Sequence, residues 1–225
     1  MTEHKLPNPM PKPMPRPKHD GGLSAVQGTP EWLAERAGHL TASAVKDAMA
    51  KVKTGEAAGR RNLRLKLATE RLTGLPSPDI YKNAAMIWGT EHEAEARRAY
   101  EVLTGEIVEE VGFCRHPTTK WLGASPDGLI GTEGMAEIKC PLSTTHLEYI
   151  EQDVVPAAYK QQMTLQMLVC NRLWVDFFSY DPRFPKHLQL FIKRYEYDIK
   201  LGMDVMADSL VFLKEVEAMV ERLSK

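Results

Sequence analysis

The spacing of apolar residues predicts three long helices. In residues 60–74, 83–105 and 199–225, apolar side chains recur every three to four positions, which places them on one face of a helix. Gly74 and Gly105 directly follow the last apolar positions of the first two stretches, and glycine commonly marks the end of a helix. These stretches therefore predict amphipathic helices that cover a core.

Shorter helices are predicted from their caps. Residues 31–37 follow a threonine that can cap a helix and a proline suited to the first helical turn. Residues 40–52 are predicted as a second helix, with Thr41 as its cap. A further helix is predicted over residues 156–171, starting at a proline.

The pattern changes to strands after residue 105. β-branched and aromatic residues interrupted by proline and glycine fill residues 106–131, which predicts short strands and turns. Residues 134–141 predict a further strand, and residues 173–181 and 188–198 predict two more. This order of elements predicts an α/β fold with a central mixed β-sheet flanked by helices.

Residues 1–28 differ in composition from the rest of the chain. Proline alternates with other residues there, which favours an extended chain and opposes helix or sheet. Four basic residues make the segment positively charged: Lys5, Lys12, Arg16 and Lys18. We predict a disordered tail, with a weak DNA tether as the alternative. The remainder, residues 29–225, is predicted to be a single domain.

The overall composition is that of a globular protein. The 225 residues are 43% apolar and 26% charged, and the formal net charge of −1 argues against a nonspecific polyanion binder. The three cysteines are widely spaced and odd in number, so we expect reduced thiols in a cytoplasmic protein. No apolar run approaches the roughly 20 residues needed to span a bilayer, and the N-terminal residues include no apolar stretch resembling a secretory signal, so no membrane association is expected.

Two acids and a lysine lie close together in strand-like sequence. Asp127 follows a proline, and Glu137 and Lys139 lie two residues apart in a predicted strand. Because alternate strand residues point the same way, Glu137 and Lys139 share one face while Ile138 points into the core. A turn over residues 128–134 would then bring Asp127 back beside Glu137.

This group has the chemistry of a hydrolytic metal site. Two neighbouring carboxylates repel each other unless a cation lies between them. Mg²⁺ prefers oxygen ligands and retains several waters, and the carbonyl of Ile138 offers a third protein oxygen. An adjacent lysine can orient a water or balance the charge of a phosphoryl group. An E-x-K pair alone is weak evidence, since exposed strands often carry it as a solvated ion pair.

Several stretches together make the chain similar to a known family. The pattern P-D…E-x-K is typical of the restriction-endonuclease-like core, and the chain more closely resembles the phage lambda exonuclease family of recombination exonucleases. The matching stretches are RAGHLTAS at 36–43, WGTEHE at 88–93, SPDG at 125–128, EIKCP at 137–141, AAYKQQ at 157–162 and YDPR at 180–183. They extend over residues 31–198, and the proline-rich tail lies outside them.

The resemblance implies a fold and an activity. The fold would be the restriction-endonuclease-like core. The activity would be a Mg²⁺-dependent, processive 5′→3′ exonuclease, with Mn²⁺ as a substitute metal. It would degrade one strand of linear double-stranded DNA to mononucleotides and leave a 3′ single-stranded tail. The resemblance also implies a ring-shaped homotrimer around DNA and a single-strand annealing recombinase as partner.

The resemblance also implies roles at the centre. Asp127 and Glu137 would bind the metal together with the backbone carbonyl of Ile138. Lys139 would activate the attacking water. Gln162 would position that water or the lysine.

Further roles implied by the resemblance lie around this centre. Glu93 would assist at the metal site, while Arg36, Ser43 and Ser125 would bind the terminal 5′-phosphate, for which a guanidinium and hydroxyls are well suited. Two DNA contacts are also implied: Met86 as an apolar wedge that parts the end base pair, and Lys53 as a cation that follows the duplex.

Plainer interpretations stand beside these. Glu93 lies in a helix rich in charged residues, and Gln162 and Gln166 also fit the polar edge of an amphipathic helix. Two other functions are alternatives: another nuclease with the same core, such as an endonuclease or repair nuclease, and a non-catalytic protein that binds DNA ends.

Overall fold

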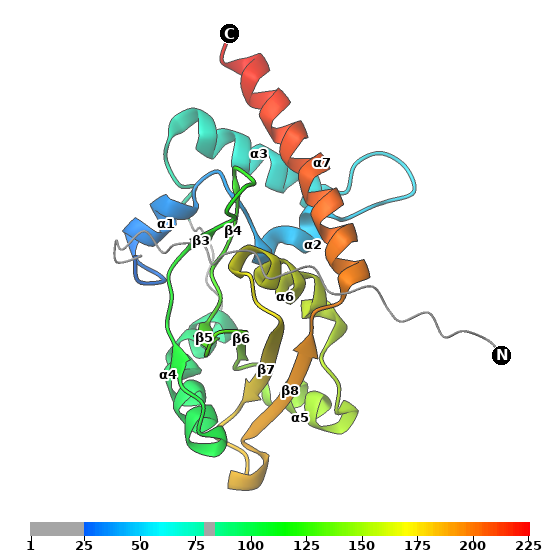
Figure 1. Cartoon of the computed structure of the whole chain (residues 1–225). Helices are drawn as coiled ribbons and strands as arrows, with labels where there is room; N and C mark the ends of the chain where they lie inside the picture. Colours follow the sequence, from blue (N-terminus) through cyan, green and yellow to red (C-terminus); the bar gives the residue numbers. More distant parts are fainter. Residues whose placement is uncertain (1–24, 79–83) are drawn as a thin grey trace, which may run out of the picture.

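The computed structural model describes residues 25–78 and 84–225 (Figure 1). The predicted tail therefore lies outside the described residues except for residues 25–28, and so does Asn83 at the start of the predicted helix 83–105. Across the two described ranges, no helix combines the length and apolarity needed to cross a membrane.

The described chain contains both α-helices and short strands (Figure 1). The helices are α1 (Pro30–Arg36), α2 (Val45–Ala48), α3 (Ala58–Thr73), α4 (Ala84–Thr104), α5 (Ser143–Gln152), α6 (Ala157–Cys170) and α7 (Ile199–Leu223), with 3₁₀ turns η1 (Ala42–Ala44) and η2 (Lys186–Leu188). The strands are β1 (Leu40–Thr41), β2 (Val108–Glu109), β3 (Cys114–Arg115), β4 (Leu122–Ala124), β5 (Gly128–Ile130), β6 (Gly134–Lys139), β7 (Trp174–Tyr180) and β8 (Leu190–Glu196). The predicted α/β class is confirmed.

The strands form two sheets. A three-stranded sheet has the order β1-β4-β3, and a five-stranded sheet has the order β2-β5-β6-β7-β8. In the larger sheet β6 and β7 are parallel and the other neighbours are antiparallel. The central sheet is therefore mixed, as predicted. Its parallel pair, β6 and β7, lies in the interior of the strand order.

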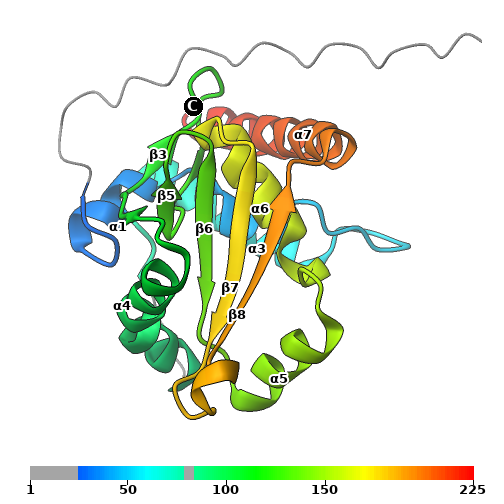
Figure 2. The same ribbon diagram turned by 60° about the horizontal axis from the view of Figure 1, so that its bottom comes forward.

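Different helices cover the two faces of the larger sheet (Figure 2). On one face, Met135 and Phe177 belong to the core that contains α6 and α7. On the other face, Ala136 and Ile138 pack with the α4 residue Tyr100. Alternation along β6 therefore separates the two cores, and it sends the side chain of each odd-numbered residue of this strand toward α6.

The helix predicted over residues 40–52 is confirmed only over Val45–Ala48, and its start is wrong. Leu40, which is fully buried, pairs in parallel with Leu122 of β4, and the segment then turns through η1 into the four-residue α2. Thr41 makes no capping hydrogen bond; its Oγ1 lies 3.2 Å from Oγ of Ser43. Pairing with a strand distant in sequence outweighs the local helical pattern here.

The other predicted helices are confirmed, and one helix was missed. Thr29 caps α1 by accepting a hydrogen bond from the Trp32 amide at 3.3 Å. Gly74 ends α3 with a left-handed backbone, at a φ of 69°. The missed helix is α5, whose Leu147 is exposed and whose one buried residue is His146. Only Tyr149 and Ile150 of α5 add apolar side chains to the core, so the helix has a short apolar face and gave a weak periodic signal.

Tyr100 joins α4 to the sheet through a buried polar cluster. Its hydroxyl donates to Oδ2 of Asp176 at 2.7 Å, and Arg194 donates to both Asp176 oxygens at 2.8 and 2.9 Å. Burial, and then the bond to Asp176, raises the pKa of Tyr100. The hydroxyl therefore stays protonated and serves as a donor to a nearly buried carboxylate.

We predict that Tyr100→Phe lowers the free energy of unfolding by about 1.5–3 kcal/mol, the usual contribution of a hydrogen bond to a charged group. Urea unfolding followed by circular dichroism measures it. Tyr197→Phe is the matched control, because within the described residues only burial and nearby charge act on the Tyr197 hydroxyl. Equal losses in the two variants would contradict the prediction.

Candidate active site

The acids and the lysine meet where the parallel strands end. Glu137 and Lys139 lie at the carboxyl end of β6, and Asp127 immediately precedes β5. Because β5 and β6 form an antiparallel hairpin in which Gly128 pairs with Ala136, Asp127 returns to the level of Glu137. Its Oδ2 accepts a hydrogen bond from the Ile138 amide at 2.6 Å. The predicted turn that folds Asp127 back beside this strand is confirmed.

Glu137 is a fully buried carboxylate, with 0% of its surface exposed. Its Oε1 accepts a hydrogen bond from Nε2 of Gln162 at 2.6 Å, and its Oε2 accepts one from Nε2 of Gln166 at 2.8 Å. Lys139 forms an ion pair with Oε1. A buried charge without partners would cost several kcal/mol, so these three donors allow a carboxylate to remain in the interior.

Lys139 provides the positive charge between the two acids. Its Nζ pairs with Glu137, lies 4.0 Å from Oδ2 of Asp127, and donates to the carbonyl oxygen of Ile138 at 3.0 Å. Burial by itself lowers the pKa of Lys139, but attraction to Glu137 and Asp127 outweighs burial and raises it above its ordinary value. The side chain is therefore an ammonium near neutral pH.

Asp127 holds its proton unusually tightly. Burial, and then repulsion from Glu137, raises the pKa of Asp127 to about 8, although Lys139 acts in the opposite direction. Repulsion from Glu93 adds to the rise. Near neutral pH the group is therefore largely protonated, and binding a further cation there would release a proton.

Glu93 approaches this centre from α4. Its Oε1 accepts a hydrogen bond at 3.3 Å from Arg97, which also pairs with Glu110. Burial raises the pKa of Glu93, while the charges of Arg97 and Lys139 lower it. The Glu93 side chain is 39% exposed and lies outside the pocket that holds the other groups. The structure thus places Glu93 in the electrostatic surroundings of the centre.

A pocket of about 250 Å³ lies beside these groups. Its walls include Asp127, Lys139, Gln162 and Gln166 from the centre. They also include every residue assigned from the sequence to a terminal phosphate: Arg36, Ser43 and Ser125. Segments far apart in the sequence therefore contribute the two sets of side chains to one space.

Trp32 and Gln27 also line this pocket and were missed in the sequence. Nε1 of Trp32 donates to Oγ of Ser125 at 3.1 Å, and the guanidinium of Arg36 lies 3.9 Å from the centre of the Trp32 ring. Gln27 donates to the carbonyl of Pro126 at 2.8 Å. The spacing of Trp32 and Arg36, four residues apart on one helix, was the available signal.

The two residues assigned to DNA contacts lie elsewhere. Met86 is 50% exposed in the first turn of α4, and Lys53 is exposed in the loop between α2 and α3. Neither residue lines the pocket that contains Lys139. The structure therefore does not place Met86 and Lys53 in this pocket with the central group, by which we mean Asp127, Glu137, Ile138 and Lys139.

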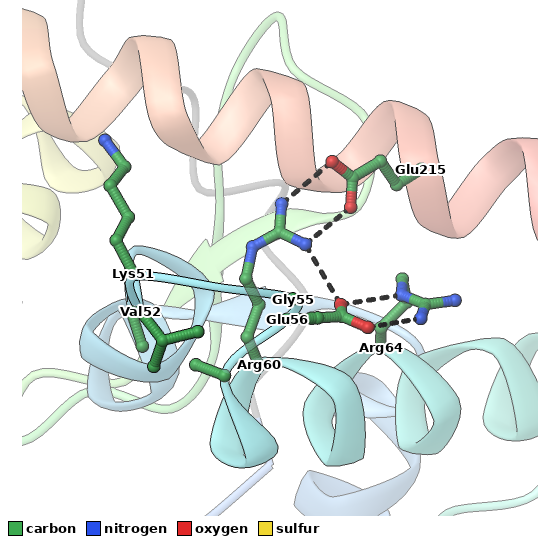
Figure 3. A pocket seen from close by; sticks show the side chains of 9 residues that line it. Lys51, Val52, Gly55, Glu56, Arg60, Arg64 and Glu215 are labelled. Carbon is green, nitrogen blue, oxygen red and sulfur yellow. Dashed lines mark hydrogen bonds and ion pairs between the residues drawn. The ribbon is translucent and has the colours of Figure 1, made fainter.

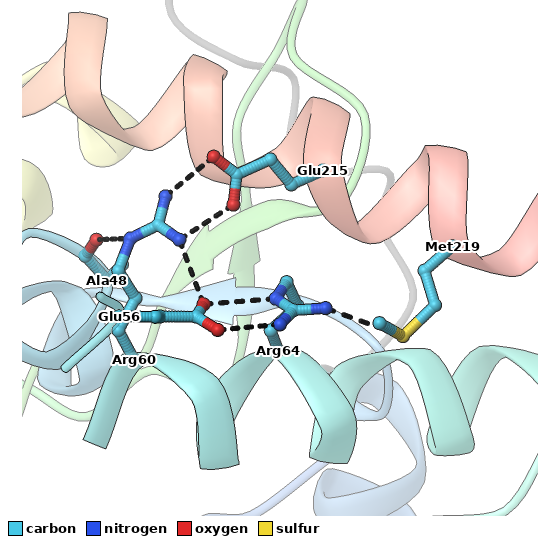
Figure 4. Close-up of polar contacts among 6 residues, drawn as sticks. All are labelled: Ala48, Glu56, Arg60, Arg64, Glu215 and Met219. Carbon is cyan, nitrogen blue, oxygen red and sulfur yellow. Dashed lines mark hydrogen bonds and ion pairs between the residues drawn. The ribbon is translucent and has the colours of Figure 1, made fainter. Parts of the chain in front are cut away.

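A second cavity, of about 480 Å³, lies between the α2–α3 loop, α3 and α7 (Figure 3). Its two arginines are bound by carboxylates: Arg60 donates to both oxygens of Glu215 at 2.7 and 2.9 Å, and Glu56 bridges Arg60 and Arg64 (Figure 4). Arg60 also donates to the carbonyl of Ala48. These contacts tie the loop to α7 and leave the arginines poorly placed to bind an anion.

Comparison with known proteins identifies the family. Residues 31–172 match the model of the YqaJ-like viral recombinase domain, a range that holds every residue of the central group. The chain belongs to this family. No curated protein sequence matches the chain significantly.

Solved structures agree with this assignment. An alkaline exonuclease, LHK-Exo from Laribacter hongkongensis, is 45% identical, with a TM-score of 0.80 over 87% of this chain and 96% of that one. LHK-Exo in complex with dAMP is 46% identical, with the same TM-score and coverage. A phage-related exonuclease from Haemophilus somnus 129PT shares the fold, with a TM-score of 0.66 at 11% identity, over 82% of this chain and 96% of that one.

These matches confirm the resemblance to lambda-type recombination exonucleases and the predicted fold. They support a recombination-associated nuclease. The matched solved structures cover 87% of this chain, so the family likeness extends over most of the folded elements.

We predict that the metal-free protein loses stability as the pH rises from about 6 to 8. Because the pKa of Asp127 is about 8 in the folded protein and near 4 in an unfolded chain, the folded state binds the extra proton in this range. The loss reaches at most about 1.4 kcal/mol per pH unit. Urea unfolding in EDTA at several pH values tests this. In Asp127→Asn the slope should be shallower, and identical slopes would contradict the assignment.

Proposed function

We propose that this protein is a Mg²⁺-dependent, processive 5′→3′ exonuclease that degrades one strand of linear double-stranded DNA to mononucleotides and leaves a 3′ single-stranded tail. The observation that carries the proposal is the shared pocket, which Arg36, Ser43 and Ser125 line together with Asp127 and Lys139. A phosphate held by the first set lies close to the hydrolytic group, as required to remove a nucleotide from a 5′-phosphorylated end.

The donor set fits a hard divalent cation. Glu137, Asp127 and Ile138 direct three oxygens toward the ammonium of Lys139, so this position already accommodates positive charge. Among the described residues no three His, Cys, Asp or Glu side chains form a metal site by themselves. The ion would then bind through two carboxylates, the Ile138 carbonyl and waters, a set typical of Mg²⁺, with Mn²⁺ as a substitute. When bound, it would stabilise charge developing on the phosphoryl group.

The side chains divide the remaining work. Lys139, whose ammonium lies beside Glu137, Asp127 and the Ile138 carbonyl, would activate the attacking water by donating hydrogen bonds to it or to a phosphoryl oxygen. Gln162 holds Glu137 and lies beside the same water position. Glu93 adds negative charge near the centre and favours cation binding.

The phosphate set is organised before substrate arrives. Trp32 supports the guanidinium of Arg36 on its ring and orients Ser125 through its indole N–H. Hydrolysis creates a new 5′-phosphate on the shortened strand. A pocket that binds this group draws the enzyme forward by one nucleotide, which favours processive movement.

The relatives support the wider setting of this proposal. LHK-Exo is named an alkaline exonuclease, and one of its two structures is a complex with dAMP, a mononucleotide. From the family resemblance we propose a cytoplasmic homotrimer that encircles DNA and works with a single-strand annealing recombinase. A ring holds DNA by enclosure, which is compatible with the near-neutral net charge of −1. Met86 as wedge and Lys53 as duplex contact remain part of this proposal.

We predict that Mg²⁺ supports digestion of linear duplex DNA but not of closed circles, and that EDTA abolishes it. Lys139→Ala should slow digestion about 10²–10⁴-fold, the usual contribution of a positioned catalytic group, and Asp127→Ala should do so at least as strongly. The control is Lys160→Ala, whose ammonium lies 6.0 Å from the centre of the Tyr195 ring. Release of mononucleotides from end-labelled DNA provides the measurement. Cleavage of circles would favour the endonuclease alternative, and full activity in Asp127→Ala would exclude this site.

We predict that a duplex with 5′-hydroxyl ends is degraded about 10–100-fold more slowly than one with 5′-phosphates, because charge-assisted hydrogen bonds contribute about 1.5–3 kcal/mol. Arg36→Gln should abolish the difference. Trp32→Phe keeps a ring but removes the donor to Ser125, and should reduce it partly. Single-turnover rates on the two substrates measure the ratio. The exposed Arg61→Gln serves as control, and equal wild-type rates on both ends would refute the phosphate pocket.

A further inference from the structure

Gln166 has no part in the mechanism above, yet it lies at the centre of the site. It follows Gln162 by one turn of α6, and the two amide nitrogens bind different oxygens of Glu137, at 2.6 and 2.8 Å. Both glutamines line the pocket that contains Lys139. The pair thus holds both oxygens of one carboxylate and prevents it from rotating.

The other end of the Gln166 side chain is unsatisfied. Gln166 is 1% exposed, and its Oε1 is buried without a hydrogen-bond partner among the described residues. An ionised carboxylate only accepts hydrogen bonds, so the amide nitrogen must face Glu137 and the oxygen must face away. An unpaired buried acceptor costs about 1–3 kcal/mol. The amide nitrogen is needed to pair the buried Glu137 carboxylate, so the cost falls on the amide oxygen alone, and a donor bound at this oxygen in the working site would remove it.

We propose that Gln166 is a positioning residue of this centre. Its nitrogen fixes Oε2 of Glu137, which leaves Oε1 directed at the cation position. Its oxygen accepts a hydrogen bond from a water in the pocket. The inference rests on the proposed function, because it makes Gln166 the support of a carboxylate that binds the divalent ion. Such supporting contacts typically change metal affinity by about 10–100-fold.

Thr164 shows what a purely structural polar residue on this helix looks like. It is fully buried on α6, and its hydroxyl lies 3.1 Å from the hydroxyl of Tyr195. It does not line the pocket. Gln161, next to Gln162, is half-buried and also lies outside the pocket lining. These two residues therefore provide matched controls on the same helix.

The test measures Mn²⁺ binding without DNA, by electron paramagnetic resonance, in wild type, Gln166→Met, Gln161→Met and Thr164→Val. We expect about 10–100-fold weaker binding in Gln166→Met and wild-type binding in both controls. Thermal unfolding in EDTA reports the stability of each variant separately. Wild-type affinity in Gln166→Met overturns the proposal, and so does an equal loss in Thr164→Val, since that loss would follow from stability alone.

A crystal structure of the wild-type protein with Ca²⁺ tests the second contact whether or not the variant folds. We expect an ordered water within about 3.2 Å of Oε1 of Gln166. An Oε1 that contacts protein atoms alone overturns the proposal. If Mn²⁺ binding depends on Gln166 but the wild-type protein leaves linear duplex DNA intact, that result would count against the proposed exonuclease and not against this contact.

Discussion

Three oxygen atoms converge on the ammonium group of Lys139, and the rest of the site is arranged around that contact. They belong to the side chains of Glu137 and Asp127 and to the carbonyl of Ile138. Without a cation between them, the charged forms of Glu137 and Asp127 would repel each other. The positive charge removes that repulsion and raises the pKa of the lysine itself. A position that accepts an ammonium in this way also suits a divalent ion.

The fold brings these oxygens together through its strand order. The β5–β6 hairpin returns Asp127 to the end of β6, where the Ile138 amide binds it. Alternation along β6 directs the side chain of Glu137 toward α6, which supplies Gln162 and Gln166. The buried charge of Glu137 in the sheet is therefore held by hydrogen-bond donors from helix α6, which packs on that sheet. Small changes in the packing of α6 would alter the direction of the Glu137 carboxylate.

The sequence was most informative where one local pattern decides the structure. Long apolar periodicity found α3, α4 and α7, and alternation in β6 separated Ile138 from its neighbours. It was misleading at residues 40–52, because pairing of Leu40 with Leu122 is not visible in local periodicity. It also gave no sign of α5, which buries little apolar surface. Pairing between distant segments caused the first error, and the small apolar surface of α5 caused the second.

By itself, the sequence identified the acids and the lysine that meet at the centre, because the order P-D…E-x-K and the family stretches mark these residues directly. It also gave the α/β class, since periodicity and turn residues act over short distances. Only the tertiary structure decided that Trp32 orients Ser125, that Gln166 holds the second oxygen of Glu137, and that Arg36, Ser43 and Ser125 share one pocket with Asp127 and Lys139. Those facts depend on side chains from α1, η1 and α6 meeting in space, and the distance between such segments is set by packing of the whole domain rather than by any local run of residues.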